Sequence, residues 1–126
     1  MTANSTPLLK LFKQAVGQKL EEVSGLNNVF YERSKMAGYP RIAYKATVWT
    51  QDSGLHGTLS CTVAGNTTAD EVDNIADTLL RELEGFSFCS PDLMYYLHSG
   101  RADPVEETDK TVRMRLVTFD FITMGG

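Results

Sequence analysis

The chain has few of the residues that most often carry chemistry, since its 126 residues include two histidines and two cysteines. Cys61 and Cys89 stand 28 positions apart, which is not the spacing of a metal site. Neither His56 nor His98 has Cys, His or Glu residues beside it at ligand spacing. We therefore expect no metal and no cofactor, and we expect both cysteines to be buried, reduced thiols.

Sequence motifs for catalysis are also missing. No G-x-S-x-G segment frames a serine, and there is neither a phosphate-binding loop nor a dinucleotide-binding fingerprint. Glu106 and Glu107 are adjacent, and neighbouring side chains of an extended chain point apart, so they make a poor acid–base pair. We expect a protein that is not an enzyme. An enzyme built around His56 or His98 is a third hypothesis, because a catalytic triad is recognised by geometry and not by sequence position.

Long apolar runs are absent as well. No segment approaches the roughly 20 apolar residues of a membrane helix. The start, MTANSTP, lacks a basic region followed by an apolar run, so it is not a signal peptide. With an apolar fraction of 42%, the sequence predicts one soluble, cytoplasmic domain over residues 1–126.

An excess of positive charge is lacking too. The net charge is −4, which argues against general nucleic-acid binding over the whole surface. Residues 1–60 carry a net +3 and residues 61–126 a net −7. This uneven distribution of charge is either accidental or the sign of a protomer whose basic surface meets an acidic surface on a neighbouring copy. In such a contact, complementary charge fixes the register of the two copies.

A first helix is predicted from Thr6, as N-cap, and Pro7, at the first helical position, to a stop at Gly25. Gly17 within this helix either allows close packing or is neutral. The apolar residues at helical spacing are Leu8, Leu9, Phe12, Val16, Leu20 and Val23.

A second helix is predicted between Thr68 and Gly85. Thr68 and Glu71 have the spacing of a capping box, and acidic residues gather in the first turn. Its apolar stripe comprises Val72, Ile75, Ala76, Leu79, Leu80 and Leu83.

Strands are predicted around the second helix. NVFY is a short one, while RIAYKATVWT and LHGTLSCTVAG alternate in polarity and are joined by QDSG, so we expect them to pair as an antiparallel hairpin. Residues 86–110 show no strong period; DLMYYL suits a short strand, and RADPVEETDK a polar loop. The fold class is α+β, a mostly antiparallel sheet with two main helices packed on one face.

The last strand, TVRMRLVTFDFITM, changes phase. Its apolar residues follow one alternation at Val112, Met114 and Leu116 and the opposite one at Val117, Phe119 and Phe121. Either a bulge inserts one residue, or both faces of the strand are covered, the second by another subunit.

Several strings occur in a characteristic order. An amphipathic helix is followed by NVFY, a short strand that ends in tyrosine, and YP enters the long strand YPRIAYKATVW. A further strand precedes the acidic helix TADEVDNIADTLLREL, and VRMRLVTFDFITM follows near the end. In this order, over nearly its whole length, the chain resembles the small tail completion, or tail terminator, proteins of long-tailed bacteriophages. The segment SPDLMYYLHSGRADPVEETDK departs from that pattern.

The resemblance implies a structural virion protein, assembled in the bacterial host cytoplasm and placed in the tail or neck. Such proteins form a ring, usually hexameric, at the head-proximal end of the tail tube, where it terminates tail polymerisation and joins tail to head. The partners implied are further copies of the chain, the tail tube protein and the head–tail connector proteins. DNA would only pass through the ring, and neither catalysis nor a membrane is implied.

Two groups of residues are candidates for the contacts of a ring. Subunit or partner contacts are expected at a basic loop and at the second apolar phase of the last strand: Arg33, Lys35, Arg41, Val117, Phe119 and Phe121. An acidic lumen lets DNA slide because it avoids phosphate contacts. The candidates for such a lining are Asp103, Glu106, Glu107 and Asp109.

Two further hypotheses stay open beside the ring. A small ligand-binding or regulatory α+β dimer would have an apolar pocket with a few convergent polar groups. A different phage neck protein, of the head-closure or adaptor kind, would be distinguished by its genomic neighbours.

Overall fold

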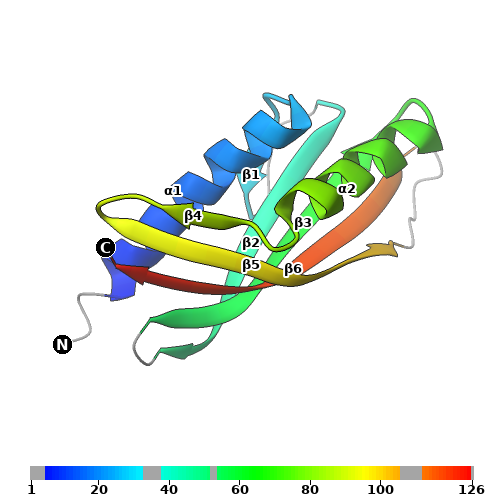
Figure 1. Cartoon of the computed structure of the whole chain (residues 1–126). Helices are drawn as coiled ribbons and strands as arrows, with labels where there is room; N and C mark the ends of the chain where they lie inside the picture. Colours follow the sequence, from blue (N-terminus) through cyan, green and yellow to red (C-terminus); the bar gives the residue numbers. More distant parts are fainter. Residues whose placement is uncertain (1–4, 33–37, 52–53, 106–111, 126) are drawn as a thin grey trace.

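The computed structural model describes residues 5–32, 38–51, 54–105 and 112–125. Their elements follow in the order α1 (Ser5–Ser24), β1 (Val29–Tyr31), β2 (Arg41–Gln51), β3 (Leu55–Gly65), α2 (Ala69–Leu83), β4 (Ser87–Cys89), β5 (Leu93–Pro104) and β6 (Arg113–Gly125). Both helices lie on the same face of the sheet (Figure 1). The predicted α+β class and its helical layer are confirmed.

The sheet has the strand order β1-β2-β3-β6-β5-β4. Only β1 and β2 are paired in parallel among the described strands; the other neighbours are antiparallel. The predicted hairpin is the β2–β3 pair. The outermost strands, β1 and β4, have three residues each, so they leave much of β2 and β5 without a neighbour along the edge.

The first helix ends where the sequence predicts. Gly25 has φ +74, a conformation that suits glycine, and its N–H donates to the Glu21 carbonyl over 2.8 Å. The start differs slightly, because α1 begins at Ser5 and not after an N-cap at Thr6.

The second helix also agrees with its prediction. Thr68 is the N-cap, and its hydroxyl accepts from the Glu71 N–H at 3.2 Å. The Glu71 carboxylate accepts from the Thr67 hydroxyl at 2.9 Å. Gly85, with φ +74, follows the C-cap residue Glu84.

The phase change in β6 has a simple explanation. The register between β3 and β6 runs without a shift from Leu55↔Thr123 to Gly65↔Arg113, so β6 contains no bulge. Val117, Phe119 and Phe121 face the helices, while Met114 and Leu116 belong to the opposite face. The two apolar phases are therefore the two faces of one regular strand.

The bulge lies in the neighbouring strand instead. The register of β5 against β6 shifts between His98 and Arg101, and Ser99 has φ 54. This strand contains most of DLMYYL, as predicted, but it is twelve residues long. It corrects the predicted polar loop RADPVEETDK, because the first four residues of that segment, up to Pro104, belong to β5.

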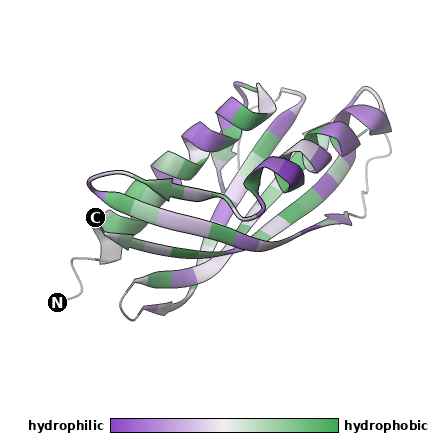
Figure 2. Ribbon diagram, viewed as in Figure 1, coloured by the Kyte–Doolittle hydropathy of each residue, from purple (hydrophilic) through white to green (hydrophobic). Residues whose placement is uncertain are grey.

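The core lies between the helices and the inner face of the sheet, where apolar residues from both layers meet (Figure 2). Phe12 of α1 is at its centre: its ring stacks on Phe121 at 4.3 Å and meets Tyr95 edge-on at 5.3 Å. The largest fully buried side chains are Phe12, Phe119, Phe121, Leu20, Ile42, Leu59, Leu79, Leu83, Leu97, Val16, Val63 and Val72.

Candidate interaction surfaces

The face of the sheet opposite the helices carries apolar side chains at one end. Met94 pairs with Met124 across β5 and β6. Two residues further along each strand, Tyr96 pairs with Ile122. We call Met94, Tyr96, Ile122 and Met124 the sheet-face patch.

The sheet-face patch is well exposed. Met94 and Tyr96 are each 41% exposed, and Met124 is 39% exposed. Tyr96 is held by a stacking contact with His98, whose ring centroid lies 5.4 Å away. Contiguous exposed apolar patches are a feature of surfaces that bind other proteins.

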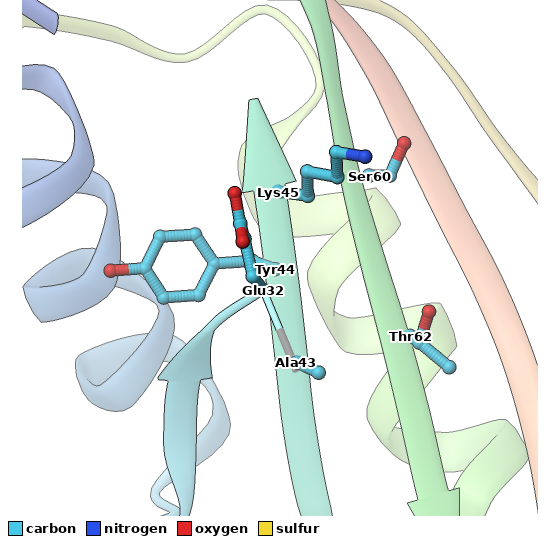
Figure 3. Close-up of a pocket in the computed structure, with 6 residues that line it drawn as sticks. All are labelled: Glu32, Ala43, Tyr44, Lys45, Ser60 and Thr62. Carbon is cyan, nitrogen blue, oxygen red and sulfur yellow. The ribbon is translucent and has the colours of Figure 1, made fainter. Parts of the chain in front are cut away.

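Polar groups occupy other parts of this face, beside the apolar Met114 and Leu116. Arg101 and Asp103 form an exposed ion pair of 3.3 Å beyond the bulge. A depression of about 330 Å³ over β2 and β3 is lined by Glu32, Ala43, Tyr44, Lys45, Ser60 and Thr62. In Figure 3 the Tyr44 ring points toward α1 and away from Ser60 and Thr62, so the lining groups do not converge on one point.

A groove runs between α1 and β1. Two adjoining hollows, of about 340 and 430 Å³, share Gln14 and Tyr44. We call them together the α1–β1 groove; its lining comprises Leu9, Lys10, Lys13, Gln14, Gly17, Gln18, Glu21, Val29, Tyr31 and Tyr44.

Tyr44 joins the two layers at this groove. Its hydroxyl donates to the Lys13 carbonyl over 2.8 Å, and its ring meets Tyr31 edge-on at 5.2 Å. The hydroxyl occupies the space that a Cβ at Gly17 would need. Gly17 therefore allows close packing, the first of its two interpretations. Burial raises the pKa of Tyr44 to about 12, so the hydroxyl remains a donor at neutral pH.

Tyr31 protects the open edge beside the groove. Its hydroxyl accepts from the Ala46 N–H at 3.2 Å and lies 3.3 Å from the Ala46 carbonyl, so it satisfies backbone groups of β2 beyond the end of β1. The Lys13 ammonium lies over the Tyr31 ring, 4.2 Å from its centroid. This arrangement places a cation at the rim of the groove.

The outer side of α2 is acidic. Asp70 and Asp77 are seven residues apart, so they lie on one side of the helix, and both are exposed; Arg81 is an exposed cation one turn further on. The carboxylate of Glu84, the C-cap residue, accepts from the Gly100 N–H and so belongs to a contact with β5. We call the carboxylates of Asp70 and Asp77 the α2 acidic stripe. Asp73, on another side of the helix, forms a 2.7 Å ion pair with Arg115 and so ties α2 to β6.

Comparison with known proteins gives the fold and no family. No protein-family model matches the chain, and no curated protein matches it. One solved structure without a functional name has a TM-score of 0.66 at 11% identity, covering 95% of this chain and 96% of the other. A chain from the virion of a native gene transfer agent particle has a TM-score of 0.49 at 14% identity, covering 85% and 84%. The first likeness supports the fold alone, and the second is too weak to support any inference.

Three of the predicted contact residues are corrected by the structure. Val117, Phe119 and Phe121 are at most 1% exposed within the single chain, where they form the floor of the core under the helices. A neighbouring subunit has no access to them. The outward apolar residues of β6 are the alternate ones, such as Ile122 and Met124, which belong to the sheet-face patch.

The other predicted contact residues are only partly described. Arg41 starts β2, and its guanidinium lies 4.5 Å from the centroid of the Tyr39 ring. Asp103 is partly buried and paired with Arg101. The remaining candidates lie outside the described residues: Arg33, Lys35, Glu106, Glu107 and Asp109.

The histidines and cysteines are not gathered into one site. His56 is on β3 and His98 on β5, and within the described residues no three His, Cys, Asp or Glu side chains are placed to hold a metal ion. Cys61 is buried as expected, but Cys89 is exposed on the edge strand β4, which corrects that part of the prediction. Neither described helix is long and apolar enough to cross a membrane.

Sequence reasoning missed the sheet-face patch and the cationic rim of the groove. The signal for the patch was present in LMYYL, where apolar residues fill both phases of a strand. For the groove, Lys10 and Lys13 each come directly after a residue of the apolar stripe of α1. This spacing places both lysines at the border of the apolar face of the helix.

Proposed function

We propose that this chain is a non-enzymatic structural protein of a phage-like virion, which forms a ring at the head-proximal end of the tail tube. The ring would terminate tail polymerisation and provide the surface to which the head is joined. The proposal rests on the resemblance in element order to the tail terminator proteins, together with a fold that has the helices and strands expected from it.

The observation that favours an assembly role is the sheet-face patch. Three of its side chains are between 39% and 41% exposed on a sheet face that has no helical layer. Burying apolar area of this kind against another protein is favourable by about 25 cal/mol per Å². A virion component has such partners on both sides, toward the tube and toward the head.

The alternative of a small-ligand module receives less support. Four hollows among the described residues hold about 200 to 430 Å³ each, and the one shown in Figure 3 lacks the convergent polar groups that fix a ligand.

The proposal is tested by mixing the purified chain with purified tail tubes and sedimenting the tubes. We expect the chain to sediment with the tubes in a fixed ratio of one ring per tube, independent of tube length. Binding in proportion to tube length, or no binding at any concentration, would contradict the proposed position. Genomic neighbours separate a tail terminator from a head-closure protein: we expect a tail tube gene on one side and connector genes on the other.

A further inference from the structure

The α1–β1 groove and the α2 acidic stripe carry opposite charge. The groove has Lys10 and Lys13 at its rim over an apolar base that includes Leu9 and Tyr31. The stripe presents Asp70 and Asp77 to solvent. Among the described residues no ion pair joins a groove lysine to a stripe carboxylate, so this complementarity is not used within the chain.

The groove also agrees in length with α2. The groove follows α1 from Leu9 to Glu21, about 18 Å at 1.5 Å per residue, and the 15 residues of α2 span about 22 Å on the same measure. A helix of this length laid along the groove would meet its rim over most of its length.

The surfaces are formed by different parts of the fold. The groove lies between α1 and β1, an outer strand of the sheet, whereas α2 packs on β3, β6 and β5 and also contacts α1. A contact between two different surfaces of identical chains is head-to-tail, and it closes into a ring when the rotation between copies divides a full turn.

We propose that the α1–β1 groove receives the α2 acidic stripe of a second copy of this chain, and that this contact builds the ring. This inference rests on the proposed function and names the partner surface for each protomer. Complementary charge would set the register of the copies and exclude the reversed contact, in which like charges meet.

Nucleic acid is the weaker candidate for the groove. DNA binding gains affinity with each phosphate that a cation neutralises. The groove offers two lysines, and Glu21 lies at its other end. The chain as a whole carries −4. The observations favour an acidic protein surface as the occupant.

A charge-swap experiment on the full chain tests the contact. One variant carries Lys10→Glu and Lys13→Glu, and the other carries Asp70→Lys and Asp77→Lys. Each alone places like charges in the contact, and we expect each to lose roughly tenfold to a hundredfold in self-association, or in ring formation on tubes, measured by native mass spectrometry and sedimentation. An equimolar mixture restores assembly, because every groove then finds a stripe of opposite sign.

Controls keep the result interpretable. Lys45→Glu and Asp92→Lys change exposed charges outside both surfaces and should assemble as the unmodified chain does. Lys13→Glu also removes the contact with the Tyr31 ring, so the single variants Lys10→Glu and Asp77→Lys are measured beside the doubles, with thermal unfolding as the check of folding.

The outcomes separate this inference from the proposed function. If the unmodified chain forms rings and both folded double variants form them too, the proposed contact is wrong, while the proposed ring remains supported. The same conclusion follows if mixing the two variants fails to restore assembly. If the lysine variant loses binding to duplex DNA but keeps assembly, the groove belongs to nucleic acid and the contact is overturned. If the unmodified chain never assembles, alone or on tubes, both proposals fail together.

Discussion

At the scale of single residues, Tyr44 accounts for a glycine in the middle of α1. Its hydroxyl spans the groove to the Lys13 carbonyl, and Gly17 leaves the space that this needs. The sequence offered close packing as one of two interpretations of Gly17. It did not identify the partner, because the pairing of position 44 with position 17 depends on how α1 crosses the sheet.

Gly17→Ala should destabilise the fold even though alanine is the better helix former. Alanine gains about 1 kcal/mol of helix propensity, but overpacking against the Tyr44 hydroxyl costs typically 1–3 kcal/mol. We expect a net loss of about 1 kcal/mol in the free energy of unfolding, measured by urea denaturation. The double variant Gly17→Ala with Tyr44→Phe should be less destabilised than the sum of the two single changes. Additive effects, or a stabilising Gly17→Ala, would show that the two residues do not compete for this space.

The two thiols should differ in reactivity. Burial raises the pKa of Cys61 from its ordinary 9.0 to about 12, whereas Cys89 is exposed on β4. The thiolate is the reactive form. We expect a thiol reagent at pH 8 to modify one cysteine in the folded chain and two in denaturant, with peptide mass spectrometry placing the first at Cys89. Equal modification of both in the folded state would contradict the described burial.

The same shift gives a pH dependence of stability. The folded state holds the Cys61 proton more tightly than the unfolded state, so the stabilisation is complete below pH 9 and is lost as pH rises toward 12. The free energy of unfolding should fall above about pH 9, and in Cys61→Ala the fall should begin only near pH 10, where unfolded tyrosines ionise. Identical pH profiles for the two proteins would remove Cys61 as the cause.

At the scale of elements, the helices and the β2–β3 hairpin could be predicted because their signals are local. Thr68, Gly25 and Gly85 are end signals, and the strands of the hairpin alternate cleanly in polarity. The first part of β5 was predicted from DLMYYL, but its extension to Pro104 was missed for two physical reasons. Met94 and Tyr96 make its outward phase apolar, and the bulge at Ser99 interrupts the alternation halfway.

The N-cap of α2 provides a test at this scale. Thr68→Ala removes the acceptor for the Glu71 N–H and should lower the free energy of unfolding by about 1 kcal/mol. Thr68→Ser keeps a hydroxyl and should cost much less. Both are measured by thermal and urea unfolding, and equal losses in the two variants would mean that the methyl group, and not the cap, is what matters.

At the scale of the whole molecule, the two faces of the sheet have different roles. One face is covered by helices and forms the core, and the other carries the sheet-face patch. The sequence placed Val117, Phe119 and Phe121 at a subunit contact because it showed two apolar phases in β6. It did not show which phase the helices cover, since that depends on the packing of segments far apart in the chain.

Polar changes in the sheet-face patch should affect assembly more than folding. Met94→Ser with Met124→Ser changes side chains that are about 40% exposed, so we expect a small effect on the free energy of unfolding, about 0.5 kcal/mol. Sedimentation with tail tubes should fall clearly. Leu11→Ser is the matched control, since Leu11 is 37% exposed on α1, away from this face. Unchanged binding in the patch variant would leave the sheet face without a role in assembly.

Electron microscopy of tail tubes incubated with the purified chain tests the central claim most directly. We predict a ring of fixed subunit number at one end of each tube, with an open axial channel. A chain that remains monomeric and unattached in the presence of tubes, or that forms a compact dimer without a channel, would contradict the account.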